Sequence, residues 1–418
     1  MRVFFLIIIS LLIGYYVGVT KISIESKNFQ PTIEISSKEP PLQAGKVDFS
    51  LMWTVMQKLT STYYDKSAID PQKFLDGAIE GMVNSLNDPY TVYLPAVKNN
   101  DFKQGLAGKF EGIGAELGMK DKQVIVMAPL DGSPAQRAGV RSGDAIIKVN
   151  SDYTNGWSLA QTVDKIRGPK GTEVALTVLH KSDSQPKEIK IVRDTITVKS
   201  LTSWTKSVKD IEEINKKASG LSPSLSTKIV YIRLSQFGDG THAEWQNMVK
   251  KISAQLKADK DIRGVVFDLR NNPGGYLNDA VLIASEFISD GVVVSQEDRN
   301  GDKVDYKVIG KGLLYDVPLV VLINRGSASA SEIVAGALQD HKRAILVGET
   351  SFGKGTIQEA EDLGGGAGLH VTMAKWLTPN GSWIHKKGLT PDVKAEVDLK
   401  DQAHDSQLEV AIEELIKK

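Results

Sequence analysis

Four near-continuous apolar runs in the carboxyl-terminal half constrain the fold of this chain more than any other feature. Each run is long enough for a strand and too short for a helix, and a strand that is apolar throughout is typical of a sheet buried on both faces. Amphipathic helical stretches separate the runs, which predicts an α/β domain with loops at the strand ends. The runs are residues 229–232, 265–269, 319–323 and 344–347, and the helical stretches are residues 243–256, 277–287 and 330–338.

Two different patterns precede this region. Apolar residues recur at helical spacing over residues 51–59 and 74–86, and the pair Asp70-Pro71 is a typical helix start, so we expect two amphipathic helices packed as a small unit. Short β segments separated by turn residues then follow at 124–127, 145–149 and 174–179. They predict a small β-rich module. The fold class is therefore multidomain α/β with a helical amino-terminal unit.

The amino terminus indicates export. Arg2 precedes an apolar run over residues 3–19, which fits either a cleaved signal peptide or a short anchor in the inner membrane, and both alternatives stay open. A polar stretch with prolines follows and predicts an extended tether. The expected location is the periplasmic or extracytoplasmic side of the cell envelope.

Charge and residue usage exclude several functions. Of the 418 residues, 51 are Lys or Arg and 51 are Asp or Glu, so no basic excess favours nucleic acid as a partner. The chain has no cysteine, which excludes disulfides, thiolate metal sites and a cysteine nucleophile. The six histidines show no H-x-x-x-H spacing. We expect neither a metal nor a cofactor.

A serine and a lysine are the best candidates for chemistry. Ser329 and Lys354 each follow a buried strand, and Lys354 lies among glycines and Phe352, where a charge has no evident structural purpose. A lysine can take a proton from a serine hydroxyl when burial lowers its pKa toward neutrality. We therefore predict Ser329 as nucleophile, Lys354 as base and Gln358, four residues on, as the residue that orients the amine.

Backbone groups near the serine are candidate oxyanion donors. Ser329 begins a predicted helix, whose dipole favours a negative oxygen, and the Asn-Pro-Gly-Gly turn at residues 272–275 also follows a buried strand. The alternative reading makes 272–275 an ordinary turn and Ser327, Ser329 and Ser331 capping serines.

A glycine pair in the β-rich module predicts peptide capture. Gly112, Ile113 and Gly114 precede a strand, so their N–H groups are suited to holding a terminal carboxylate while the strand edge takes an added peptide. A simple turn is the alternative.

Together these segments resemble the carboxyl-terminal processing peptidases, or tail-specific proteases, over nearly the whole chain. The 25-residue spacing between Ser329 and Lys354 is the most specific feature. The other matching segments are Asp88-Pro89-Tyr90, Tyr93-Leu94, Gly112-Ile113-Gly114, Ser133-Pro134-Ala135, Ala138-Gly139, Gly143-Asp144, Arg167-Gly168, Lys170-Gly171-Thr172 and residues 268–275.

The resemblance implies a PDZ domain that gates access, a crotonase-like α/β catalytic core and cleavage of proteins with exposed carboxyl termini. It also implies oxyanion donors at the N–H groups of Gly275 and Ala330. In some members of the family an arginine at the position of Arg167 contacts the catalytic site as a regulatory switch, and an ordinary solvated arginine is the alternative for Arg167. An adaptor protein and a homodimer are further partners that the resemblance leaves open. The implied boundaries are 1–20 signal or anchor, 21–45 tether, 46–105 helical region, 106–198 PDZ domain, 199–227 linker, 228–400 catalytic core and 401–418 carboxyl-terminal helix.

Three alternatives compete with this interpretation. Ser203 and Lys206 match the S-x-x-K pattern of penicillin-recognising enzymes, but no S-D-N or K-T-G run accompanies them. His341 follows the serine helix and could be proposed as base, although a helix carboxyl-terminal role suits it better. The third alternative is a catalytically silent PDZ scaffold that captures carboxyl termini. The 203–227 segment is longer than the resemblance implies, and a loop over the cleft or a dimer contact are open roles for it.

Overall fold

The structure is a computed structural model that describes residues 22–27, 30–35, 48–120, 123–130, 132–180, 183–211, 227–396 and 405–417. The chain divides into two compact units, Met1–Ala78 and Ile79–Lys418. The apolar run at residues 3–19 lies outside the described residues. Among those described, no helix combines the length and apolar character needed to cross a membrane.

The amino-terminal unit contains a hairpin and a helix. Strands β1 (Ile22–Lys27) and β2 (Gln30–Ile35) pair antiparallel within the stretch expected to be a tether. Isoleucine alternates with polar residues in β1, which is a strand pattern. Helix α2 (Ser50–Thr62) buries none of its side chains, and a 3₁₀ turn, Lys66–Ala68, follows. Helix α3 (Pro71–Asn84) starts where the sequence predicts, with the Asp70 carboxylate accepting the N–H of Gln72 at 2.9 Å.

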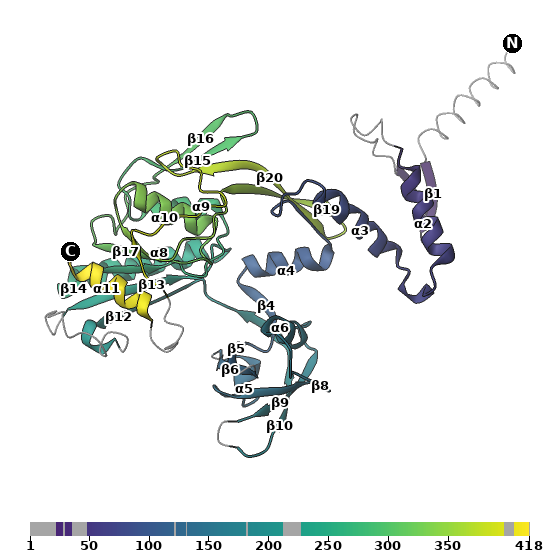
Figure 1. Ribbon diagram of the computed structural model, residues 1–418, viewed down its shortest axis with the longest axis horizontal. Helices are drawn as coiled ribbons and strands as arrows, with labels where there is room; N and C mark the ends of the chain where they lie inside the picture. Colours follow the sequence, from purple (N-terminus) through teal and green to yellow (C-terminus); the bar gives the residue numbers. More distant parts are fainter. Residues whose placement is uncertain are drawn as a thin grey trace, which may run out of the picture. The chain divides into compact units, whose positions relative to one another are not determined.

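The β-rich module forms one antiparallel sheet with two helices (Figure 1). Its core is built by alternation, because every second residue of β9 is buried. Strand β5 forms one edge of the sheet, and helix α6 contacts it. The sheet order is β10 (Lys187–Val192), β9 (Glu173–Leu179), β7 (Ala145–Val149), β6 (Gln123–Pro129) and β5 (Ala115–Lys120), with β8 (Asp152–Tyr153) on β7, helices α5 (Pro134–Arg137) and α6 (Leu159–Ile166), and a separate pair of β4 (Lys109–Gly112) and β11 (Asp194–Thr197).

The carboxyl-terminal region holds the predicted parallel sheet. All four apolar runs form neighbouring parallel strands, which confirms the α/β expectation, and every residue of β17 is buried. The three predicted helices also form. The sheet order is β12 (Leu201–Ser207), β13 (Lys228–Leu234), β14 (Ile262–Asp268), β17 (Leu319–Ile323), β18 (Ile345–Gly348) and β21 (Val393–Lys394), and the helices are α8 (Thr241–Ala258), α9 (Leu277–Ser285) and α10 (Ala330–Asp340).

Helices cover both faces of this sheet. Val265 and Phe267 of β14 belong to the hydrophobic core that also contains side chains of α8, α9 and α10. Val266 points to the opposite face and shares a second core with α11 (Ser406–Lys417), the yellow helix in Figure 1. The sheet is therefore the middle of three layers, and the ends of its strands carry the candidate site.

A second, antiparallel sheet and one helix complete this region. Helix α4 (Ala96–Leu106) contacts β3, β4 and β20. The strand order is β16 (Lys303–Lys307), β15 (Val292–Asp298), β20 (Ala367–Leu377) and β19 (Thr356–Gly364), with β3 (Val92–Leu94) on β20.

The stretch expected as a linker, 199–227, begins with a strand of the sheet that contains the four apolar runs. Strand β12 pairs antiparallel with β13, and the Trp204 ring stacks on Tyr231 at 4.8 Å between centroids. Ser203 and Lys206 lie on this strand, where residues three apart face opposite sides. The S-x-x-K alternative needs a helical turn and is therefore wrong. Residues 212–226 lie outside the described part.

Candidate active site

Ser329 lies at the amino-terminal end of helix α10, as the sequence predicts. Its backbone has φ 54° and ψ −116°, a conformation that costs a residue other than glycine roughly 1–3 kcal/mol. The Ser329 N–H donates to Glu332 Oε2 at 2.9 Å. A serine in an unfavourable conformation at a helix start is a candidate nucleophile rather than an ordinary cap.

The 272–275 turn is joined to the serine segment by hydrogen bonds. The Asn272 carbonyl accepts the Ala328 N–H at 3.0 Å and the Ser331 hydroxyl at 2.9 Å. The Asn272 side chain in turn accepts the N–H of Gly274 and donates to the carbonyl of Leu234. The two loops form one rigid assembly.

Glycine is required in this turn because the serine comes so close. A Cβ atom on Gly274, whose φ is 98°, would lie 2.8 Å from the Ser329 Cβ. In the described part of the chain, the N–H groups of Gly275 and Ala330 donate to no protein acceptor. Both groups flank Ser329 and are available to an external oxygen.

Lys354 lies in the loop between β18 and β19, and its backbone is fixed on both sides. Its N–H donates to Glu332 Oε2 at 2.9 Å. The Trp376 indole donates to the Lys354 carbonyl at 2.9 Å, and the Trp383 indole donates to the Gly355 carbonyl at 2.8 Å. These bonds leave little freedom to the loop.

The Lys354 side chain is half-buried, and its amine lies beside an aromatic ring. Its Nζ lies 5.1 Å from the centroid of Tyr90 and makes no hydrogen bond to a described residue. Burial lowers the pKa of Lys354, and the charges of Asp88 and Glu332 oppose this shift only in part. Burial also raises the pKa of Tyr90. A neutral amine is therefore favoured relative to an exposed lysine, as a base requires.

Gln358 lies on strand β19. Its Nε2 donates to the hydroxyls of Thr356 at 2.9 Å and Thr372 at 3.1 Å, and no described residue donates to its Oε1. Gln358 shares a cavity with Lys354, but no hydrogen bond joins them in the described structure. Its orienting role stays a prediction.

One cavity of about 500 Å³ brings the predicted residues together. Ser329, Lys354, Gln358, Gly275 and Ala330 all line it. Apolar side chains form much of the remaining wall, and they include Val92, Phe102, Leu106, Leu277, Ile333, Ile357 and Trp376.

Glu332 is the site residue that the sequence did not reveal. Its side chain is fully buried, and it accepts four hydrogen bonds from the serine and lysine segments. A glutamate three residues after a helix-capping serine suggests only a capping box. The additional bonds to the lysine loop come from a segment about twenty residues away.

A buried network of ion pairs and hydrogen bonds supports the start of the 272–275 turn. The Arg270 guanidinium donates to Asp268 at 2.6 Å and to Asp405 at 2.7 Å, and Tyr231 donates to Asp268 at 2.6 Å. Burial and the charge of Asp268 raise the pKa of Tyr231. Because Asp405 precedes α11, the network ties this helix to the start of the turn.

His341 is the carboxyl-terminal cap of α10. Its Nε2 donates to the Val292 carbonyl at 2.8 Å, and it does not line the cavity of Ser329. This agrees with the structural role that the sequence favoured.

The predicted peptide-binding residues lie just before edge strand β5: Gly112 ends β4, and Ile113 and Gly114 join β4 to β5. Ile113 is buried, and its carbonyl accepts the Ala135 N–H, while Gly114 has φ 72°. In the described part of the chain, the N–H groups of Ile113 and Gly114 have no protein acceptor. This pattern suits a carboxylate.

Arg167 caps helix α6 and lies 5.3 Å from the ring centroid of Phe110. It lines a separate cavity of about 750 Å³ with residues of α4 and β4, and not the cavity of Ser329. Its regulatory role stays a prediction.

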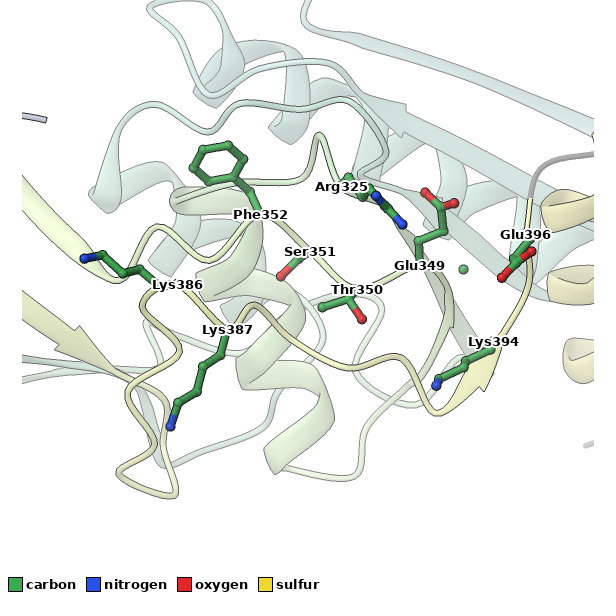
Figure 2. Close-up of a pocket in the computed structure, with 10 residues that line it drawn as sticks. Arg325, Glu349, Thr350, Ser351, Phe352, Lys386, Lys387, Lys394 and Glu396 are labelled. Carbon is green, nitrogen blue, oxygen red and sulfur yellow. The ribbon is translucent and has the colours of Figure 1, made fainter. Parts of the chain in front are cut away.

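A third cavity, of about 500 Å³, borders the lysine loop (Figure 2). It shares Ser351 and Phe352 with that loop. Figure 2 shows Arg325 close to Glu349 at one end of the cavity and Lys386 and Lys387 at the other. Both signs of charge are present, so the cavity favours no class of ligand.

Solved structures of proteases share the fold of this chain. The structure is similar to that of a photosystem II D1 C-terminal processing protease, with 32% identity, a TM-score of 0.51 and coverage of 83% of this chain and 92% of the other. A putative S41 protease from Bacteroides fragilis NCTC 9343 has a TM-score of 0.56 at 14% identity, which shows a common fold.

The sequence comparisons identify the family. Residues 228–395 match peptidase family S41, residues 104–179 match the PDZ domain, and residues 7–97 match the activating protease CtpB N-terminal domain. The carboxy-terminal processing protease CtpA of Bacillus subtilis is 37% identical over 84% of this chain and 70% of its own length. CtpB of the same organism is 37% identical over 80% of this chain and 65% of its own length. The chain therefore belongs to the S41 family of carboxy-terminal processing serine peptidases.

Proposed function

We propose that this chain is an exported serine endopeptidase that captures the carboxyl-terminal tails of proteins in its PDZ domain and cleaves them with a Ser-Lys dyad. One observation supports this most strongly. The half-buried Lys354 amine shares a cavity with Ser329, and Gly275 and Ala330, whose N–H groups donate to no acceptor in the described part of the chain, line the same cavity.

The mechanism follows from these positions. The neutral Lys354 amine accepts the Ser329 hydroxyl proton while Oγ attacks the scissile carbonyl carbon. The N–H groups of Gly275 and Ala330 donate to the resulting oxyanion. The Lys354 ammonium then protonates the leaving amine, which leaves an acyl-enzyme. Water hydrolyses this ester with Lys354 again acting as base, and Gln358 Oε1 accepts a hydrogen bond from the amine.

We assign substrate capture to the outer edge of β5 and the residues just before it. In the described part of the chain, the outer edge of β5 is free to add a peptide strand, α6 flanks it, and the N–H groups of Ile113 and Gly114 donate to no protein acceptor. We assign the PDZ domain to residues 106–198 and the catalytic core to residues 228–400. Arg167, an adaptor and a homodimer are proposed means of regulating access.

The test uses an unfolded protein with an apolar tail and intact-mass spectrometry of its products. Wild type should cleave it, with kcat rising with pH as Lys354 loses its proton. Ser329→Ala and Lys354→Ala should lose cleavage yet still bind the tail. Lys387→Ala, an exposed lysine of the third cavity, is the matched control and should cleave normally.

Two results would overturn the proposal. Cleavage by Ser329→Ala at the wild-type rate would exclude this nucleophile. Tail binding without any cleavage by the wild-type chain would instead support the silent scaffold.

A further inference from the structure

The carboxylate of Glu332 connects the two halves of the candidate dyad. Oε2 accepts the N–H of Ser329 and the N–H of Lys354, both at 2.9 Å. Oε1 accepts the Ser351 hydroxyl and the Gly353 N–H, both at 2.6 Å. The backbones of nucleophile and base therefore converge on a single oxygen atom.

We propose that Glu332 is a positioning residue of the peptidase site, whose buried carboxylate holds the Ser329 backbone and the Lys354 loop in register. This inference rests on the proposed function. Glu332 is fully buried, so it does not touch the substrate. It acts through the two residues that do.

The arrangement compensates for the burial of a charge. A buried carboxylate is destabilising unless hydrogen bonds satisfy it, and here four donors do so. Glu332 also lies in the first turn of α10, where the helix dipole favours a negative charge. The four donors come from the serine and lysine segments, so the carboxylate is stable in the interior only when both segments are in place.

The bond to Ser329 has a second consequence. The unfavourable conformation of Ser329 persists only if its surroundings impose it. Its N–H is held by Glu332, while the Ala328 N–H and the Ser331 hydroxyl are held by the Asn272 carbonyl. Loss of the carboxylate leaves the nucleophile free to relax toward an ordinary helix cap.

Glu332 also acts on the base through its charge, which favours protonated Lys354 and so opposes the effect of burial. The other titratable groups around the amine are Asp88 and Tyr90 before β3, His370 on β20, and His385, whose ring packs against Tyr90 at 5.9 Å. Removal of the Glu332 charge alone should thus lower the pKa of Lys354.

The experiment compares Glu332→Gln with wild type in steady-state cleavage over pH 6 to 10. Glutamine keeps the size of the side chain but lacks the charge and one acceptor. Because one or two hydrogen bonds to a charged group are lost, kcat should fall about tenfold or more. KM should stay within about twofold, because the residue does not touch the substrate. The acid limb of the kcat profile should move to lower pH. Glu349→Gln makes the same change five residues before Lys354 and should alter none of these values.

Ser351→Ala provides a milder variant of the same network. It removes one donor to Glu332 and should lower kcat by about threefold with KM unchanged. If Glu332→Gln fails to fold by circular dichroism, this variant decides the question, and wild-type kcat in Ser351→Ala overturns the proposal.

The inference and the proposed function fail in different ways. Wild-type kcat and pH profile in folded Glu332→Gln, or a raised KM with an unmoved profile, would overturn the positioning role. Ser329→Ala in the same assay tests the function itself, and its full activity would reject the dyad whatever Glu332 does.

Discussion

Lys354 is a charged residue in a place where a charge is unfavourable. Its amine lies over the Tyr90 ring and makes no hydrogen bond to a described residue, so the folded protein stabilises the neutral form. The burial that lowers the pKa of Lys354 therefore also reduces the stability of the fold. The lowered pKa of Lys354 should therefore be detectable as a pH-dependent free energy of unfolding, without any substrate.

We expect Lys354→Met to raise the free energy of unfolding at neutral pH. The pKa of Lys354 is lowered in the folded state, so below both pKa values the fold carries the full penalty of the buried charge. Between the folded and unfolded pKa values the unfolded chain binds more protons, and stability rises with pH. The penalty is gone above the unfolded value of about 10.4. Denaturant unfolding at pH 7, 9 and 10.5 should show the difference between variant and wild type shrinking.

Lys387→Met is the control, because that side chain is exposed and should change stability little at any pH. A gain from Lys354→Met that is equal at all three pH values would indicate better packing, and would contradict a depressed lysine pKa.

At the scale of elements, the site depends on three strand ends brought together and on one helix distant in sequence. The turn after β14, the serine after β17 and the lysine after β18 meet because these strands are parallel neighbours. Helix α11 joins them through Asp405, which pairs with Arg270 at the start of the turn. The carboxyl-terminal helix thus supports the site without entering it.

Arg270→Met should destabilise the protein by about 3–5 kcal/mol, because it leaves Asp268 charged, fully buried and without its main partner. Chemical denaturation monitored by circular dichroism measures the loss. Arg233→Met is the matched control: its side chain is partly exposed and makes one 3.4 Å contact with Asp268, so it should cost under about 1 kcal/mol. Equal losses in the two variants would show that the network does not anchor the turn.

Hydrophobic periodicity predicted the helices and strands, but it could not predict the features that depend on tertiary contacts. The strands and helices of the catalytic core followed from uninterrupted apolar runs, and α3 began at Pro71 because its cap is local. Gln358 lies on a strand, where it donates to threonine hydroxyls, and not in the turn from which we expected it to reach Lys354, although both residues line one cavity.

Two further features depended on distant partners. We expected a linker where β12 forms because its sequence is largely polar. The Trp204–Tyr231 stacking that joins it to β13 involves residues distant in the sequence. Glu332 resembled an ordinary cap because its partners in the lysine loop are remote in sequence.

At the scale of the molecule, the two activities that we propose, tail capture and cleavage, belong to separate sheets of one chain. The PDZ sheet offers a free edge and unpaired N–H groups, while the catalytic sheet offers the serine and lysine. Under the proposed function, a substrate tail binds to both sheets. Its terminal carboxylate and its scissile bond should therefore contribute to different kinetic constants.

We expect a substrate peptide with an amidated carboxyl terminus to show a KM about tenfold higher than the free acid, with little change in kcat. Amidation removes the charged acceptor that the Ile113 and Gly114 N–H groups would bind, a loss of roughly 1–2 kcal/mol. Cleavage of both peptides by wild type, followed by chromatography, measures the effect. Amidation of a glutamate side chain within the peptide is the control for charge, and equal KM values for free and amidated tails would contradict capture of the terminus.

The hydrogen bonds from Trp376 and Trp383 to the lysine loop give the protein a built-in optical reporter. Both indoles donate to carbonyl groups at or next to Lys354, one from a buried ring and one from a half-exposed ring. Indole emission depends on hydrogen bonding and on exposure to water. A movement of the lysine-loop backbone away from either indole would break one of these bonds, so intrinsic fluorescence should report such a movement in the unlabelled chain.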